Sequence, residues 1–295
     1  MYTVMGATGN IGSQLVGILL GPGEKVRVMG RSSERLKAFV DRGAEAAVGD
    51  VSDAAFLTKT FAGADAVFAM IPPNYAADDF RGLYNEIAAK ITRAIQDSGV
   101  KHVVFLSSHG AHLSENTGVV LGLHDAEQRL NQLDGVHVLH LRPTYFMENL
   151  LSNVGMIKNM GVMGGEIRGD VQFAMIATKD IAAVAAEHLV KRDFSGKAVR
   201  ELLGERDVSM NEAAQVFGAK IGKPDLKYVR FPPEDAKKAM MDLDFSADVS
   251  DGLLELGKAI NDGLMAVNHP RTPENTTATS IEDFADYFAQ VYKSS

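Results

Sequence analysis

The sequence predicts an α/β fold in which helices cover both faces of a doubly wound parallel sheet, with a smaller, mostly helical C-terminal lobe. Short apolar segments alternate with amphipathic segments over the first half of the chain, a pattern typical of parallel sheets with right-handed crossovers. A glycine-rich turn follows the first apolar segment, and the alternation weakens after Arg142 and Pro143. We therefore expect a main domain over residues 1–150 and a lobe over residues 151–295 that shares strands with the sheet.

Six strands are expected in the first half, each a short apolar run bounded by turn residues. They span residues 2–5, 25–29, 44–48, 64–70, 102–106 and 136–141. The helices between them span residues 10–20, 34–42, 53–61, 79–98 and 122–133. In the first helix Ile11, Leu15 and Leu19 recur at helical spacing. Ser32 or Ser33 can cap the second helix, because a serine oxygen accepts N–H groups of the first turn.

Helices also dominate the expected C-terminal lobe. They span residues 149–160, 178–191, 211–221, 233–241, 250–261 and 280–292, and short strands are expected near 171–175 and 199–203. Thr178 is the expected cap of the helix over 178–191, one face of which carries Ile181, Val184 and Leu189. We expect the two short strands to rejoin the main sheet.

The composition excludes several classes of protein. The 295 residues include no cysteine, which rules out disulfides, zinc–thiolate sites, iron–sulfur clusters and thiol catalysis. The formal net charge of −8 argues against binding to nucleic acid, since such proteins carry basic faces. No apolar run approaches the roughly 20 residues that span a bilayer, the first residues do not resemble a secretory signal, and no spaced cluster of His, Asp or Glu suggests a metal. We expect a cytoplasmic protein.

The strongest chemical signal is the glycine loop, which consists of Gly6, Ala7, Thr8, Gly9, Asn10, Ile11 and Gly12. It follows a strand and opens a helix, the context that a dinucleotide-binding fingerprint requires. The first glycine permits the tight turn, the second lets the backbone approach a pyrophosphate, and the third lets the helix pack closely on the strand. A glycine-rich turn without a ligand is the alternative, but spacing and context together favour an NAD(P)-binding Rossmann fold.

The end of the second strand indicates which dinucleotide binds. An acidic residue there would bind the ribose hydroxyls of NAD, whereas an arginine accommodates the extra phosphate of NADP. Arg31 and Ser32 follow this strand, and no acidic residue occurs before Glu34. We therefore expect NADP(H) to be preferred over NAD(H). The alternative is that Arg31 is a solvated loop residue.

Two further loops are expected to touch the cofactor at the same edge of the sheet, where ligands of this fold bind. Asp50 and Val51 follow the third strand, where the carboxylate can bond the adenine amino group and the valine can cover its ring. A role for Asp50 as a turn or cap residue is an equal alternative. Ile71, Pro72 and Pro73 form a rigid apolar loop after the fourth strand.

Four segments of the sequence resemble the NmrA-like group of atypical short-chain dehydrogenases/reductases: GATGNIG, GDVSD, HVVFLSS and LRPTYFMENLL. The resemblance extends over nearly the whole chain and implies a Rossmann fold with an NAD(P) cofactor. It also implies that Thr144, Tyr145, Phe146 and Met147 close over the nicotinamide end. Members of this group include NADPH-dependent quinone or dye reductases and non-catalytic sensors of NAD(P) redox state.

Catalytic short-chain dehydrogenases use a Tyr-x-x-x-Lys pair to exchange a proton with the substrate, and this pair is missing after the fifth strand. Many relatives place a lysine near position 123 or 124. Here His124 is the nearest substitute, with helix packing as the alternative. Ser107 could orient the nicotinamide, and His109 could act as an acid because histidine titrates near neutrality. Tyr145 could also replace the missing acid, although a packed aromatic is the favoured interpretation. No Gly-x-Ser-x-Gly elbow supports a hydrolase.

Two hypotheses follow from these residues and from the resemblance. The leading one is an NADPH-dependent reductase that transfers hydride to a quinone or a similar conjugated aromatic acceptor, which can accept hydride without a strong general acid. The alternative is a non-catalytic NADP(H) sensor that regulates a protein partner. The missing Tyr-x-x-x-Lys pair is compatible with both hypotheses.

Overall fold

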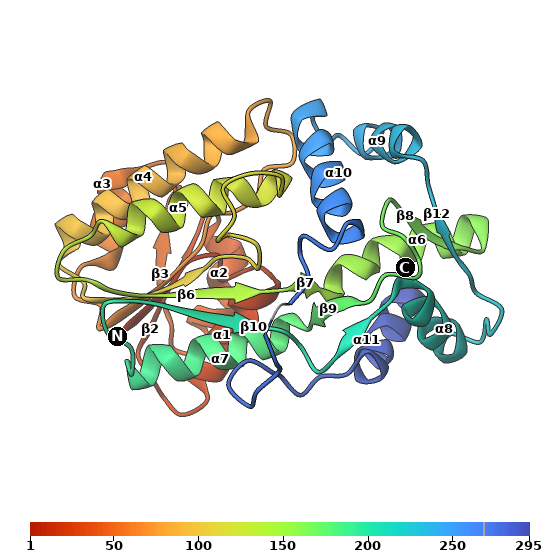
Figure 1. The fold of residues 1–295 in the computed structure, drawn as a ribbon. Coiled ribbons are helices and arrows are strands. Elements are labelled where there is room, and N and C mark those ends of the chain that lie inside the picture. The colour runs from red at the N-terminus through yellow and green to blue at the C-terminus, as the bar shows by residue number, and fades with distance from the viewer. Residues whose placement is uncertain (268) are drawn as a thin grey trace.

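The computed structural model describes residues 1–267 and 269–295. Seven parallel strands form the main sheet in the order β3-β2-β1-β4-β5-β6-β10 (Figure 1). They are β1 (Tyr2–Val4), β2 (Val26–Gly30), β3 (Glu45–Val48), β4 (Ala66–Ala69), β5 (His102–Leu106), β6 (His137–Pro143) and β10 (Lys197–Leu202). The strand order reverses between β1 and β4, so the chain creates the crevice at which doubly wound sheets bind ligands. The predicted fold class is confirmed.

Helices cover both faces of this sheet. On one face lie α1 (Asn10–Leu20), α2 (Ser33–Val40) and α7 (Thr178–Lys191), and on the other α3 (Ala54–Phe61), α4 (Phe80–Ser98) and α5 (Leu121–Asn131). Successive strand residues point to opposite faces. Phe68 therefore joins the core beneath α1 and α7, whereas its neighbour Val67 joins the core beneath α3, α4 and α5.

Local capping explains where several helices begin. The Ser32 hydroxyl accepts a hydrogen bond from the N–H of Arg35, as predicted for the second helix. Asp53 and Asp79 cap α3 and α4 in the same manner. Such side-chain oxygens satisfy N–H groups that have no partner within the helix.

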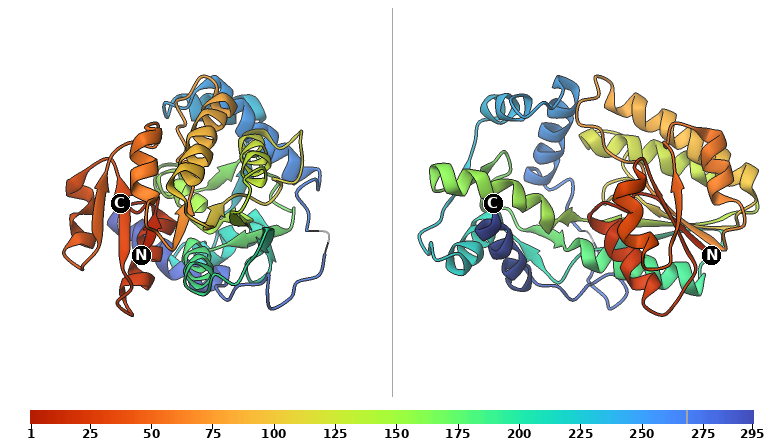
Figure 2. Two further views of the ribbon diagram at one scale, coloured as in Figure 1. Left: turned by 90° about the vertical axis from the view of Figure 1, so that its left-hand side faces the viewer. Right: turned by 180° about the vertical axis from the view of Figure 1, so that it is seen from behind.

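The lobe lies beyond the carboxyl ends of the strands (Figure 2). It contains a three-stranded sheet of β7 (Tyr145–Phe146), β9 (Phe173–Ile176) and β11 (Asp207–Val208), and a pair of β8 (Met163–Gly165) and β12 (Tyr228–Arg230). Its helices are the 3₁₀ helix η2 (Met147–Ser152) and the α-helices α6 (Asn153–Met160), α8 (Met210–Lys220), α9 (Pro233–Met241), α10 (Ala247–Asn261) and α11 (Ile281–Ser294). A second 3₁₀ helix, η1 (Gly118–Val120), lies in the β5–α5 loop and contacts α10. Phe217 of α8 stacks on Phe288 of α11 at 4.1 Å between ring centroids, in the lobe's own core.

Three expectations need correction. The strand near 199–203 joins the main sheet as β10, but the strand near 171–175 does not, because β9 pairs with β7 and β11. The helix expected over 149–160 is divided into η2 and α6. Thr178 does not cap α7. Instead, the Glu148 carboxylate accepts hydrogen bonds from the backbone N–H and the hydroxyl of Thr178.

Helix α10 joins the lobe to the main sheet. The Asp248 carboxylate accepts a hydrogen bond of 2.8 Å from the N–H of Phe80 at the start of α4. A Cβ at Gly118 would lie 1.8 Å from the carbonyl oxygen of Gly252, so η1 and α10 approach through two glycines. Within the described residues, no helix is both long and apolar enough to cross a bilayer.

Candidate functional site

The glycine loop forms a cradle at the carboxyl end of β1. Gly6 has a φ of +63°, which glycine adopts at no steric cost, and its carbonyl accepts a 2.9 Å hydrogen bond from the N–H of Gly9. A Cβ at Gly12 would lie 2.0 Å from the Gly6 carbonyl oxygen. The turn and the first helical turn therefore fit together only when position 12 carries no side chain.

The N-terminus of α1 is free to bind an anion. Its N-cap is Gly9, which offers no side-chain oxygen, and the first turn contains no acidic residue. Thr8, Gly9 and Asn10 are exposed. Because backbone N–H groups and the helix dipole both favour negative charge there, the cradle suits the pyrophosphate of a dinucleotide.

Arg31 lies at the end of β2, exposed and without an ion pair to any other described residue. Ser32 is occupied as the cap of α2. The Asp50 carboxylate accepts a 2.8 Å hydrogen bond from the N–H of Ser52. That bond, with a smaller contribution from Arg31, holds the pKa of Asp50 below its ordinary value. Asp50 is thus a turn residue in this structure, and Val51 beside it is half-buried.

The loop after β4 faces the lobe. Ile71 is buried, Pro72 is half-buried and Pro73 is exposed. The ring of Tyr75, which follows them, stacks on Phe245 of the lobe with 4.8 Å between centroids. The loop therefore lies between the sheet edge and the segment that leads into α10.

The Ser107 hydroxyl points into the protein. It donates a hydrogen bond to Glu127, a carboxylate that is 1% exposed and also accepts bonds from Arg142 Nε and Nη2. Burial would raise the pKa of Glu127, but the bonds from Arg142, with His140 and Ser107, bring it below its ordinary value. The hydroxyl that we expected to orient the nicotinamide is therefore bonded to Glu127.

The two candidate histidines make different contacts. His124 is half-buried, and its Nδ1 lies 2.9 Å from the carbonyl oxygen of Ala111, so this nitrogen carries the proton when the ring is neutral. Its Nε2 makes no hydrogen bond to the described residues. His109 is buried, with Nε2 3.1 Å from the carbonyl oxygen of Met265 and Nδ1 3.4 Å from Glu201 Oε1.

The loop after β6 is held at the sheet edge by Thr144, whose N–H and hydroxyl both donate to the carbonyl oxygen of Leu202. The ring of Tyr145 lies edge-on to Phe173, and burial raises the pKa of its phenol well above the ordinary value. Phe146 is half-buried and Met147 is buried. The contacts of Tyr145 agree with the packed aromatic that we favoured.

Sequence reasoning missed three acidic residues that organise this region. Glu127, Glu148 and Glu201 form the buried contacts described above, each with a partner distant in the sequence. Glu127 alone gave a signal, because it shares the apolar face of α5 with Leu123, Ala126 and Leu130. The described residues contain no cluster of His, Asp or Glu that could hold a metal ion.

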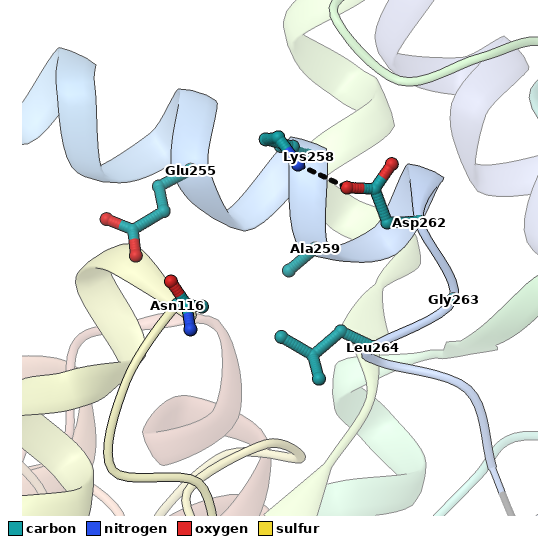
Figure 3. A pocket seen from close by; sticks show the side chains of 7 residues that line it. All are labelled: Asn116, Glu255, Lys258, Ala259, Asp262, Gly263 and Leu264. Atoms are coloured by element: carbon teal, nitrogen blue, oxygen red, sulfur yellow. Dashed lines mark hydrogen bonds and ion pairs between the residues drawn. The ribbon is translucent and has the colours of Figure 1, made fainter.

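Two clefts border α10, and of the described residues none from 6–12 lines either one. The larger has a volume of about 460 Å³ and is lined by Asn116 and by the charged side chains of Glu255, Lys258 and Asp262 (Figure 3). The smaller, of about 240 Å³, is lined in similar measure by apolar groups, among them Phe173, Ile260 and Met265, and by polar groups, among them Gln172 and Asn261. The smaller cleft thus reaches the ring that packs against Tyr145.

Comparisons with known proteins agree with this architecture. The sequence profile of the NmrA-like family matches residues 2–285. An NAD(P)H azoreductase of Xenophilus azovorans is 28% identical over 256 residues, 87% of this chain and 86% of the azoreductase. The Citrobacter sp. triphenylmethane reductase complexed with NADP(H) superposes with a TM-score of 0.80 at 20% identity, covering 98% of this chain and 100% of that chain. An Escherichia coli NADPH-dependent quinone oxidoreductase complexed with NADPH gives 0.75 at 21% identity, covering 97% and 99%.

Proposed function

The chain belongs to the NmrA-like family, and from that premise we propose that it is an NADPH-dependent reductase that transfers hydride to a quinone or a similar conjugated aromatic acceptor. The observation that carries the proposal is the cradle of Gly6, Gly9 and Gly12 at the free N-terminus of α1. The relatives that are named as azo, dye and quinone reductases support the class of acceptor.

Arg31 supports NADPH as the preferred cofactor. Its guanidinium is exposed beside the cradle and has no carboxylate partner among the described residues, so it can bind the 2′-phosphate without breaking an existing ion pair. Guanidinium groups match phosphate oxygens with a planar set of donors. The loop from Thr144 to Met147 is held at the sheet edge and is proposed to cover the nicotinamide end.

Bound NADPH supplies the hydride, and a quinone that takes it together with one proton leaves as the quinol, with NADP⁺ as the other product. The residues of the site need only orient the two rings, exclude water and admit the proton. His124 is the proposed source of that proton, because its Nε2 has no partner in the described structure. Solvent can reprotonate the ring after each turnover.

The test is NADPH consumption against a panel of quinones, azo dyes and triphenylmethane dyes, together with calorimetric titrations of NADPH and NADH. We expect turnover with at least one acceptor and a lower dissociation constant for NADPH than for NADH. Tight NADPH binding without turnover across the panel would contradict the reductase and favour the redox sensor. Failure to bind either dinucleotide would contradict both.

A further inference from the structure

The segment between α10 and α11, residues 263–267 and 269–279, crosses the carboxyl edge of the sheet, and we call it the strap. Its first residues separate the two clefts. Leu264 lines the larger cleft (Figure 3). The next residue, Met265, lines the smaller one. The position of Met265 therefore helps to set the shape of the smaller cleft.

The β5–α5 loop holds Met265 in place. The ring of His109 bonds the Met265 carbonyl, and Gly110 leaves room for the Met265 side chain, since a Cβ there would lie 2.6 Å from its Cε. Further along the strap, Arg271 bonds the carbonyls of Leu203 and Gly204 at the end of β10. The strap is thus attached to two strand ends of the main sheet.

A second ring proton would let His109 satisfy both of its contacts. Nε2 faces a carbonyl oxygen, which can only accept, so that nitrogen must carry a proton. Nδ1 is buried without a hydrogen-bond partner of good geometry and lies 3.4 Å from Glu201 Oε1. A neutral ring would present a lone pair to a carboxylate, whereas an imidazolium would attract it.

Other charged groups surround this pair. His269 of the strap lies 2.9 Å from Glu201 Oε2, Arg142 of β6 acts on Glu201, and the ring centroid of His112 lies 6.2 Å from that of His109. The contact with His109 keeps the pKa of Glu201 below its ordinary value, so Glu201 remains an anion. Two imidazole rings, one from the β5–α5 loop and one from the strap, thus contact the half-buried Glu201 carboxylate at the end of β10.

We propose that doubly protonated His109 is a positioning residue that fixes Met265 and thereby the wall of the small cleft, in which a flat aromatic acceptor of one or two rings binds. The acceptor assignment rests on the proposed function. The cleft volume of about 240 Å³ lies below the roughly 300–1,000 Å³ of sites for drug-sized ligands. Phe173, Ile260 and Met265 can contact the faces of an aromatic ring, and the polar groups of Gln172 and Asn261 line the same cleft. Loss of the Nδ1 proton removes the attraction to Glu201 while the Nε2 bond to Met265 remains, so the strap loosens and acceptor binding weakens as the pH rises.

The first experiment measures hydrogen exchange in strap peptides of the whole protein, independently of activity. Wild type and His109→Phe are compared at about pH 5.5 and about pH 8.5, on either side of ordinary histidine titration. At the lower pH the strap of His109→Phe should exchange faster than that of wild type, and at the higher pH the difference should narrow, because wild type then keeps only the Nε2 bond to Met265. His112→Gln changes a neighbouring imidazole that makes no bond to the strap and should behave as wild type. Equal exchange of wild type and His109→Phe at both pH values would overturn the proposal.

Two further variants keep the test decisive if His109→Phe does not fold. In Glu201→Gln the amide can bond Nδ1 in either protonation state, so the strap should stay protected at both pH values. His109→Gln retains a donor toward Met265 but carries no charge. Its strap should therefore not show the loosening that wild type shows when His109 loses its Nδ1 proton at high pH. A pH dependence that persists in both variants would refute the role of the His109 charge.

The second experiment measures steady-state reduction of a naphthoquinone. His109→Phe should raise the acceptor KM about tenfold or more, the scale expected for one charge-assisted bond, and the NADPH dissociation constant should not change. A fall in kcat with KM unchanged would contradict a positioning role. Absence of turnover in the wild type would refute the proposed function, while the exchange experiment would still decide whether His109 fixes the strap.

Discussion

Removal of the Glu127 carboxylate should strongly destabilise the fold, because it leaves a buried guanidinium without its counter-ion. The Arg142 side chain is 13% exposed and bonds Glu127 through both Nε and Nη2. Loss of one partner of such a pair costs about 3–5 kcal/mol, a large part of the roughly 5–15 kcal/mol by which domains are stable. We therefore expect Glu127→Ala to lower the free energy of unfolding by about 3–5 kcal/mol.

Urea denaturation followed by circular dichroism measures this loss. The matched control is Glu187→Ala, which removes the exposed i,i+4 pair with Lys191 and should cost only about 0.3–0.5 kcal/mol. The double variant Glu127→Leu with Arg142→Met removes both charges and should recover much of the loss, because no buried charge then lacks a partner. Recovery would separate the electrostatic cause from lost packing.

The pH dependence follows from the lowered pKa of Glu127. A carboxylate whose pKa is lower in the folded state contributes stability above its unfolded pKa of about 4.3, and this contribution is lost as the pH falls through the folded value. The difference between wild type and Glu127→Ala should therefore shrink in acid. If Glu127→Ala costs under about 1 kcal/mol at neutral pH, as an exposed pair would, the reasoning is wrong.

Three further predictions concern the cofactor site. Gly12→Ala should abolish NADPH binding in a calorimetric titration, because the new Cβ would lie 2.0 Å from the Gly6 carbonyl oxygen. Arg31→Ala should weaken NADPH about 10- to 150-fold, the scale of one charge-assisted phosphate contact, and leave the NADH dissociation constant unchanged. His124→Ala should lower kcat about 10²-fold or more if the ring supplies the proton, whereas His124→Lys should retain turnover if the side chain faces the nicotinamide ribose.

Each of these substitutions has an informative control or outcome. Gly155→Ala places a Cβ where no atom lies within 4 Å and should leave cofactor binding intact. Arg129→Ala is the control for Arg31→Ala, because it removes an exposed arginine of α5 that is distant from the cradle in sequence. It should leave NADPH binding intact. Equal losses of NADPH and NADH in Arg31→Ala would assign Arg31 to the fold or the adenine. Wild-type turnover in both His124 variants would leave the proton to another donor.

Local signals in the sequence were sufficient for much of the secondary structure. Helices α1, α7 and α9 and strand β5 have the bounds that periodicity and flanking turn residues predicted. Ser32 caps α2 because capping depends on residues three positions apart. The doubly wound parallel sheet also followed, since parallel strands joined by helices leave few topologies.

Contacts between distant residues could not be predicted in the same way. Thr178 looked like a cap, but the N-terminus of α7 is satisfied by Glu148, 30 residues earlier in the chain. The Ser107 hydroxyl bonds Glu127 rather than facing the cofactor edge. Each outcome depends on which buried polar groups meet when the layers pack, and a single sequence records that only weakly. The roles of Ser107, His109, His124 and Tyr145 stay predictions.

The position of β10 at the edge of the sheet has a consequence for folding during translation. Strand β6 is complete when Pro143 leaves the ribosome, but its outer neighbour spans Lys197–Leu202. About fifty residues, including Glu148 and all of α7, must therefore emerge while the edge of β6 exposes unpaired backbone groups. During the same interval the face of α1 that α7 later covers also stays exposed. Exposed edges invite pairing with other chains, so a nascent chain that stalls within this interval should recruit holding chaperones or aggregate more than one that stalls after Leu202.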